Sequence, residues 1–284
     1  MICMNRISTH FLDLEGIKTA YYSTEGEGTP IVLLHGGGVD HAMLSWKTIM
    51  QTWTGSQPLV ALDLPGYGNS DKPELEYSLS FYTGFLNAFL DTLNAQNVTL
   101  CGLSMGGAIA LQYALRYPNY IGKLVLVAPW GVSASVPYSL MGRLLVRLPL
   151  NQVAYKTLQN RWLAKNIIAG SLIGNREKIT PEILDEVQTA AHSKDAARVF
   201  QSFQISELWG EPPVGHLIPL LPQIKVPTLF IQGDKDPGVK VGDVKQAAAS
   251  MPNTRVEIFE HHKHWVQKES PERFVDIVRD FVES

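Results

Sequence analysis

The sequence predicts an α/β fold in which a mostly parallel, doubly wound sheet carries an inserted group of helices. Short, continuously apolar runs recur along the chain, as is typical of strands covered on both faces. Helix-like stretches lie between these runs, and such alternation indicates a parallel sheet with helices on both sides. One long segment, residues 131–222, has helix-like stretches separated by prolines and glycines but no strand-like run. We therefore expect a core of residues 1–130 and 223–284 and a helical insert of residues 131–222.

The individual elements can be placed coarsely. Residues Ile7 to Tyr22 alternate loosely around Glu15-Gly16, which indicates a hairpin of two short strands. The apolar runs expected to form strands are Ile31–Leu34, Leu59–Leu62, Val98–Cys101, Leu124–Val127, Thr228–Ile231 and, at the end, Val256–Phe259. The expected helices are Ala42–Thr52, Ser80–Leu93, Met105–Arg116, Asp243–Ser250 and Pro271–Val282, the last with Ser270 as its N-cap.

Composition limits the classes of function. The chain has 284 residues, of which 45% are hydrophobic and 18% charged, so it is long enough to bury a large core. Its formal net charge of -3 gives no overall attraction to nucleic acid. The first residues lack a basic region followed by an apolar segment, and no apolar run reaches the length of a membrane span. We expect a cytoplasmic protein that acts on a small molecule without a membrane or nucleic-acid partner; the sequence does not indicate an oligomeric state.

Cysteine usage adds little to this. The two cysteines, Cys3 and Cys101, are too few for a disulfide framework or a cysteine-based zinc site. Cys101, on an expected strand, is interpreted as a small buried apolar residue.

A serine lies between the run Val98–Cys101 and the expected helix Met105–Arg116. It belongs to Gly102-Leu103-Ser104-Met105-Gly106, a Gly-x-Ser-x-Gly pattern between a strand and a helix. In this setting the pattern is typical of a nucleophile elbow, a sharp turn that holds the serine hydroxyl above the sheet. The alternative is an ordinary glycine-rich turn, so a base, an acid and an oxyanion site must be found elsewhere.

A glycine-rich loop, His35-Gly36-Gly37-Gly38, follows the first buried strand. Acyl transfer needs two N–H donors aimed at the oxygen that becomes negative, one commonly from such a loop and one from the residue after the nucleophile. The expected oxyanion donors are therefore the amides of Gly37 and Met105.

The expected base is His264, which follows the last strand and precedes the final helix. Its imidazole has a pKa near neutrality and so suits proton transfer from a serine. The nearby His262 could instead suggest a metal site, but two loop histidines without a third ligand are weak support, so we expect no metal and no cofactor.

The expected acid follows the strand Thr228–Ile231, in Gly233-Asp234-Lys235-Asp236. Asp234 lies nearer the strand end, whereas Asp236 precedes a proline that biases it toward an extended backbone. The residues alone leave both carboxylates open, and either gives the chain order serine, acid, histidine.

These motifs resemble those of the α/β-hydrolase fold family over nearly the whole chain. Besides the motifs above, the resemblance includes the stretch Asp63-Leu64-Pro65-Gly66-Tyr67-Gly68-Asn69-Ser70 and the pair His264-Trp265. It implies Asp236 as the acid, through the family's Gly-x-x-Asp pattern, and a cap over the active site. We expect Gly38, Trp130 and Trp265 to line the substrate pocket.

Within the family, the chain most resembles carbon-carbon bond hydrolases of aromatic meta-cleavage pathways. Ser104-Met105-Gly106-Gly107-Ala108 and Ile121-Gly122-Lys123-Leu124 carry this resemblance, with the glycine loop and His264-Trp265. The chain departs from it at Val39-Asp40-His41, where those enzymes usually have Pro-Gly-Ala. It also departs at Val187, which aligns with their cap arginine for the substrate carboxylate. The serine at the elbow distinguishes the chain from haloalkane dehalogenases and epoxide hydrolases, which use aspartate there.

Three functions follow as expectations. The first is a cofactor-free serine hydrolase of small, largely apolar esters or related acyl compounds, acting through an acyl-enzyme. The second is carbon-carbon hydrolysis of a vinylogous diketone, and the third is a hydrolase-fold ligand receptor. Because a fold does not name its substrate, the motifs alone do not decide among them.

The first half of the expected cap is basic. Residues Gly131 to Arg176 include no acidic residue. The basic residues there are Arg143, Arg147, Lys156, Arg161, Lys165 and Arg176, and Leu140, Leu144, Leu145 and Leu148 give a helical apolar stripe. The expected arrangement is a helix that packs its leucines on the core and leaves its arginines in solvent. Contact with a membrane or orientation of an acidic substrate are the alternatives.

Overall fold

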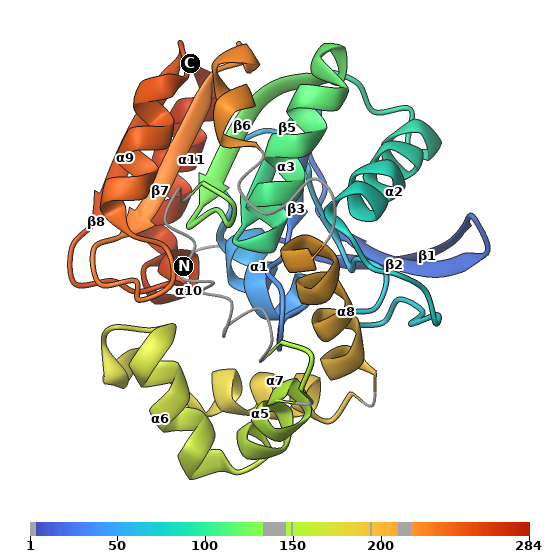
Figure 1. Cartoon of the computed structure of the whole chain (residues 1–284). Helices are drawn as coiled ribbons and strands as arrows, with labels where there is room; N and C mark the ends of the chain where they lie inside the picture. The colour runs from blue at the N-terminus through green and yellow to red at the C-terminus, as the bar shows by residue number, and fades with distance from the viewer. Residues whose placement is uncertain (1–3, 133–145, 149, 194, 210–216) are drawn as a thin grey trace.

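The computed structural model describes residues 4–132, 146–148, 150–193, 195–209 and 217–284. Its core is an eight-stranded sheet in the order β1-β2-β4-β3-β5-β6-β7-β8 (Figure 1). The strands are β1 (Ser8–Leu14), β2 (Ile17–Ser23), β3 (Ile31–Leu34), β4 (Leu59–Leu62), β5 (Val98–Leu103), β6 (Ile121–Val127), β7 (Thr228–Gly233) and β8 (Thr254–Phe259). Strands β3 to β8 are parallel, and the β1–β2 hairpin joins β4 antiparallel. The prediction of a mostly parallel sheet is confirmed.

The helices lie between the strands, as the alternation predicted. Those of the sheet region are α1 (Ala42–Thr52), α2 (Leu79–Thr92), α3 (Met105–Arg116), α9 (Val241–Ser250), α10 (Val266–Glu269) and α11 (Pro271–Glu283). Helices α5 (Leu150–Leu158), α6 (Arg161–Ser171), α7 (Pro181–Ala191) and α8 (Ala196–Trp209) lie between β6 and β7. Short 3-10 turns occupy Pro118–Tyr120, Arg176–Lys178 and Ile218–Gln223.

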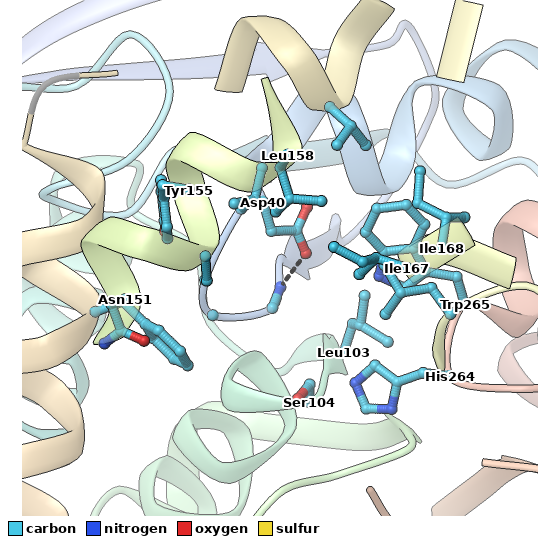
Figure 2. A pocket seen from close by; sticks show the side chains of 18 residues that line it. Asp40, Leu103, Ser104, Asn151, Tyr155, Leu158, Ile167, Ile168, His264 and Trp265 are labelled. Atoms are coloured by element: carbon cyan, nitrogen blue, oxygen red, sulfur yellow. Dashed lines mark hydrogen bonds between the residues drawn. The ribbon is translucent and has the colours of Figure 1, made fainter. Parts of the chain in front are cut away.

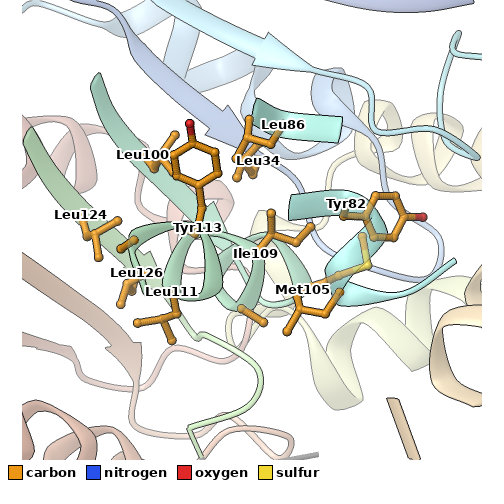
Figure 3. Close-up of a cluster of buried hydrophobic side chains, with 14 of the residues drawn as sticks. Leu34, Tyr82, Leu86, Leu100, Met105, Ile109, Leu111, Tyr113, Leu124 and Leu126 are labelled. Carbon is orange, nitrogen blue, oxygen red and sulfur yellow. The ribbon is translucent and has the colours of Figure 1, made fainter. Parts of the chain in front are cut away.

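The central strands are buried on both faces. In β3, Val32 and Leu34 pack with the α2, α3 and α9 side, whereas Ile31 and Leu33 pack with the α1 and α11 side. Figure 3 shows the first of these layers, where Leu34 and Leu100 of the sheet lie near Ile109 and Tyr113 of α3. This double cover explains why the strands appear in the sequence as continuous apolar runs rather than alternating ones.

Two details differ from the predicted elements. The four-residue helix α10 separates His264 from α11, and it was not predicted because so short a helix has no readable periodicity. Ser270 precedes α11 as predicted, but its side chain does not cap that helix. Its hydroxyl instead lies 2.6 Å from Nε2 of His262.

Helices α5 to α7 form a group beyond the carboxyl ends of β6 and β7, whose arrowheads point toward it (Figure 1). The division into a core and a cap of residues 131–222 stays a prediction, because the structure gives no independent domain boundary. Leu140, Leu144 and Leu145 of the expected stripe lie outside the described residues, as do the basic residue Arg143 and Cys3. Over the described ranges, no helix is long and apolar enough to cross a bilayer.

Candidate active site

Ser104 occupies a strained turn between β5 and α3. Its backbone has φ 51° and ψ -112°, a combination that a non-glycine residue adopts only where surrounding contacts enforce it. Three backbone hydrogen bonds hold it: its N–H donates to Val127 O at 2.9 Å, and its carbonyl accepts from Ala108 N at 3.1 Å and Trp130 N at 3.0 Å. The turn has the backbone strain expected of a nucleophile elbow.

The glycines of the elbow are required by close backbone approach. A Cβ added to Gly102 would lie 2.3 Å from Gly106 O, and one added to Gly106 would lie 2.4 Å from Leu34 O. The first turn of α3 therefore packs directly on the ends of β3 and β5, where Leu34 pairs with Gly102. The strand order reverses between β3 and β5. Doubly wound sheets bind their ligands at the carboxyl ends of the strands at such a point.

The glycine loop leaves β3 beside Ser104. A Cβ added to Gly36 would lie 3.6 Å from Ser104 Cβ, and one added to Gly37 would lie 3.4 Å from Met105 Sδ. The carboxylate of Asp40 holds the loop by accepting from Gly36 N and from the Ser45 hydroxyl, each at 2.8 Å. The two predicted oxyanion donors, Gly37 and Met105, thus lie close together next to the serine.

His264 is bound to Asp236, not to Asp234. Its Nδ1 donates to Asp236 Oδ2 at 2.7 Å, so Nε2 is the ring nitrogen left to take a proton. Figure 2 shows the imidazole beside the Ser104 side chain, and both residues line the same cavity. Asp234 forms an ion pair with Lys235 at 3.2 Å instead. The geometry thereby separates the two carboxylates that the sequence left open.

Asp236 is buried and surrounded by donors. Its carboxylate also accepts from Gly238 N at 2.8 Å, Val239 N at 3.1 Å and Gln232 Nε2 at 3.2 Å. Burial alone would raise the pKa of Asp236, but its hydrogen bond to His264, the charge of that ring and the two backbone N–H groups lower the pKa below its ordinary value. The carboxylate is therefore ionised at neutral pH and holds the imidazole in one orientation.

The other histidines near the site have structural contacts. His35 is fully buried; its Nδ1 donates to Gly36 O at 2.7 Å and its Nε2 accepts from Leu64 N at 3.1 Å. His262 uses both ring nitrogens, toward Glu260 O and the Ser270 hydroxyl, each at 2.6 Å. Within the described part of the chain, no three histidine, cysteine or acidic side chains are grouped as metal ligands would be.

Two chambers meet at Ser104. The larger has a volume of about 340 Å³ and the smaller about 150 Å³, and both are lined by Gly37, Ser104 and Phe200. Of the residues predicted to line the pocket, Gly38 and Trp265 lie in the large chamber and Trp130 in the small one. The elbow therefore opens on two cavities.

Comparison with known proteins places the chain in a family. The profile of the alpha/beta hydrolase fold family matches residues 29–271, which is most of the chain. The chain belongs to this family. The resemblance inferred from the motifs is confirmed, and the fold class with it.

The alpha/beta hydrolase has curated relatives over almost its whole length. It is 26% identical to the 2-hydroxy-6-oxo-6-phenylhexa-2,4-dienoate hydrolase of Comamonas testosteroni, over 92% of this chain and 90% of that protein. It is 29% identical to an uncharacterized protein of Mycobacterium tuberculosis, over 96% of this chain and 81% of the relative.

A solved structure shares the fold. The meta-cleavage product hydrolase of Pseudomonas fluorescens IP01 is 22% identical, with a TM-score of 0.79 over 96% of this chain and 97% of that one. At this level of identity the likeness concerns the fold alone.

The sequence analysis missed several residues that line the two chambers. Helix α5 contributes one face, and α8 contributes Phe200, whose ring would lie 2.6 Å from a Cβ added to Gly37. The α5 residues that line the large chamber are Asn151, Ala154, Tyr155 and Leu158. Their spacing of three and four residues is a helical signal that a periodicity search over residues 150–158 would have found. Asp40 was noted only as a departure from a family motif.

The basic residues of the insert do not line either chamber among the residues that the structure describes. Arg161 pairs with Asp185 of α7, and the guanidinium of Arg147 lies 4.0 Å from the centre of the Trp209 ring. Leu148 is half exposed, so for this residue the expected packing of the leucine stripe on the core is wrong. These contacts account for Arg147 and Arg161 as parts of the insert's own packing.

Proposed function

We propose that the protein is a serine hydrolase that cleaves a small, largely apolar ester or related acyl compound through an acyl-enzyme. One observation carries the proposal: a serine on a strained elbow and a histidine bound to a buried carboxylate line one apolar cavity. Membership of the alpha/beta hydrolase fold family supports it. The reaction needs water as its co-substrate.

In the proposed first step, Ser104 Oγ attacks the carbonyl carbon of the substrate while Nε2 of His264 takes the hydroxyl proton. The imidazolium then forms beside the ionised Asp236, whose negative charge stabilises it. His264 returns the proton to the leaving alcohol, which departs and leaves the acyl group on Ser104. Water, deprotonated by the same histidine, attacks this ester; the bond to Ser104 Oγ then breaks, His264 gives its proton to that oxygen, and the acid is released.

The negative charge on the carbonyl oxygen needs donors during both attacks. The amides of Gly37 and Met105 are the proposed pair. Met105 begins α3, so its N–H has no partner within the helix and lies at the positive end of the helix dipole. Gly37 supplies a second amide from the opposite loop, without a side chain that would collide with Phe200.

The chamber walls support an uncharged, largely apolar substrate. The large chamber includes Leu103, Leu158, Ile168 and Val187, and the small one Phe203 and Leu208. Because Ser104 lies where the chambers meet, the scissile bond is proposed to lie there, with the acyl and alcohol parts on either side.

The second candidate is carbon-carbon hydrolysis of a ring-cleavage dienoate, which the named activity of the Comamonas testosteroni relative favours. Two residues favour the ester instead. The buried acidic side chain of Asp40 lines the large chamber (Figure 2) and offers no positive charge to a substrate carboxylate. Val187 lines the same chamber, where the resemblance implied an arginine.

The serine mechanism is tested with a fluorophosphonate probe and the Ser104→Ala variant. The probe should label the wild type at Ser104 and leave the variant unlabelled. Ester turnover in the variant should fall to the residual acceleration, roughly 1,000-fold over water, that binding and oxyanion donors supply without a nucleophile. Wild-type turnover by Ser104→Ala would refute the mechanism.

The substrate class is tested by parallel assays of a short p-nitrophenyl ester and a ring-cleavage dienoate. A higher kcat/KM for the ester supports the proposal, and a higher value for the dienoate supports the second candidate. Tight binding of either compound with negligible turnover would instead favour a ligand receptor.

A further inference from the structure

The loop that carries His264 is attached to the insert on both sides of the histidine. Before it, the Lys263 ammonium donates to Gly170 O at 2.9 Å and also to Ala169 O. After it, Trp265 N donates to Leu172 O at 2.8 Å. We call these contacts, together with those of Glu269 described next, the docking seam; it joins residues 169–175, at the end of α6, to residues 261–269.

Glu269 completes the seam. It is almost fully buried, and its two carboxylate oxygens accept from Gly174 N at 2.8 Å and Asn175 N at 2.7 Å. Hydrogen bonds from N–H groups to a carboxylate are among the stronger ones in proteins. A short insert segment is therefore held by a buried acidic side chain from the sheet region.

Backbone contact brings the two segments together without space for a side chain. A Cβ added to Gly174 would lie 2.1 Å from His261 O. Lys263 places its positive charge at the carbonyl end of α6, where the helix dipole favours a cation. Two independent features, charge placement and steric fit, thus serve the same contact.

We propose that the docking seam positions the His264 imidazole, and that Glu269 is a positioning residue for the reaction. This inference rests on the proposed function, in which His264 is the base. Asp236 orients the ring through Nδ1, but the backbone of residues 263–265 sets where the ring stands relative to Ser104. That backbone is fixed to the insert through Lys263 and Trp265. Glu269 in turn holds the insert segment through the amides of Gly174 and Asn175.

The proposal also gives residues 169–175 of the insert a role in the active site. These residues contact the loop of His264 directly, so this end of the insert is part of the frame that holds the catalytic groups. Displacement of an acid–base group by about 1 Å lowers rates on the order of 100-fold, which is why such a frame matters.

The test compares Glu269→Ala with Asp185→Asn. The first variant leaves the Gly174 and Asn175 amides without their acceptor, whereas the second removes the ion pair between Asp185 and Arg161, which lies within the insert and away from the seam. For a short p-nitrophenyl ester, Glu269→Ala should lower kcat by about 10-fold or more, with KM changed less than about twofold. Asp185→Asn should leave both constants near wild type.

A pH profile separates positioning from loss of folded protein. In Glu269→Ala the acid-limb midpoint of kcat/KM should move, because the ring no longer keeps its contact with Asp236. Partial unfolding alone would lower the amplitude without moving the midpoint. An unchanged midpoint together with unchanged kcat overturns the inference, as does a lowered kcat with an unmoved midpoint.

Two further measurements keep the test decisive. If Glu269→Ala does not fold, Glu269→Gln and Lys263→Met replace it; each weakens the seam, and a normal kcat and profile in both would overturn the inference. Fluorophosphonate labelling of the wild type distinguishes a failure of the proposed function from a failure of the positioning role. An unlabelled, inactive wild type refutes the proposed function, whereas a labelled, active wild type with unaffected seam variants refutes only the positioning role.

Discussion

The strand-end loops of the sheet region and the helices of the insert contribute to one cavity in different ways. The loops are built from backbone constraints: Ser104 has an enforced positive φ, and Gly106 fits only without a side chain. The helices supply side chains such as Leu158 and Phe200 from ordinary helical backbone. Under the proposed function, the loops supply the chemistry and the helices select which molecule reaches it.

The largest expected effect concerns the strand-end loops, where substitution of Asp236 is compared with substitution of Asp234. Asp236→Asn should lower kcat/KM for an ester by about 1,000- to 10,000-fold, because an amide does not stabilise the imidazolium and favours the wrong ring tautomer. Asp234→Asn is the matched control two residues away, and its kcat/KM should stay close to wild type. Equal losses in the two variants would show that the 233–239 loop as a whole matters, not the contact between Asp236 and His264.

The difference between the strand-end loops and the helices of the insert also explains which site residues the sequence could predict. Ser104 and the glycine loop lie in short patterns whose residue types follow from local backbone geometry, and His264 was predicted from its place after the last strand. Asp236 could not be separated from Asp234 by local reasoning, because the choice depends on a hydrogen bond across 28 residues of sequence. The family resemblance was needed for that step.

The walls of the chambers were the least predictable part. Periodicity over residues 150–158 marks the face of α5 that carries Tyr155, but only the packing of α5 and α8 over the sheet turns Tyr155 and Phe200 toward the cavity. Glu269 was missed for a similar reason. Its partners, Gly174 and Asn175, lie more than 90 residues earlier in the chain. A contact between segments so far apart in the chain cannot be predicted from a short sequence motif.

The insert side of the comparison is tested at Phe200. The Phe200→Ala variant removes the ring that lines both chambers, so it should join them into one larger cavity. We expect the ratio of kcat/KM for an octanoyl ester to that for a butyryl ester to change by about 10-fold in favour of the longer chain, as filling apolar space is worth a few kcal/mol. The rate of fluorophosphonate labelling at Ser104 should change much less.

Ile205→Ala, on the same helix but outside both chambers, is the control for loss of helix packing. If the chain-length ratio changes equally in the two variants, the wall role of Phe200 is wrong. If labelling falls as steeply as ester turnover in Phe200→Ala, the separation between chemistry and selectivity fails at this residue.

The smallest expected effect is on stability, at a buried contact between the insert and the sheet region. Glu207 of α8 accepts from Leu79 N, the first residue of α2, at 2.6 Å. Burial raises the pKa of Glu207; the Leu79 hydrogen bond opposes this rise and the charge of Glu76 adds to it. Because the folded protein binds this proton more tightly than the unfolded chain, the carboxyl lowers stability as pH rises from its unfolded pKa through its folded one.

Glu207→Gln removes this pH-dependent penalty while keeping an oxygen that accepts from Leu79 N. The melting temperatures of the variant and the wild type should therefore be close at pH 4, and at pH 7 the variant should melt about 1 to 2 °C higher. The exposed Glu25→Gln serves as the control and should show no such trend. A Glu207→Gln variant whose disadvantage grows with pH would mean that the charged carboxylate stabilises the join between α8 and α2, with the helix N-terminus outweighing the effect of burial.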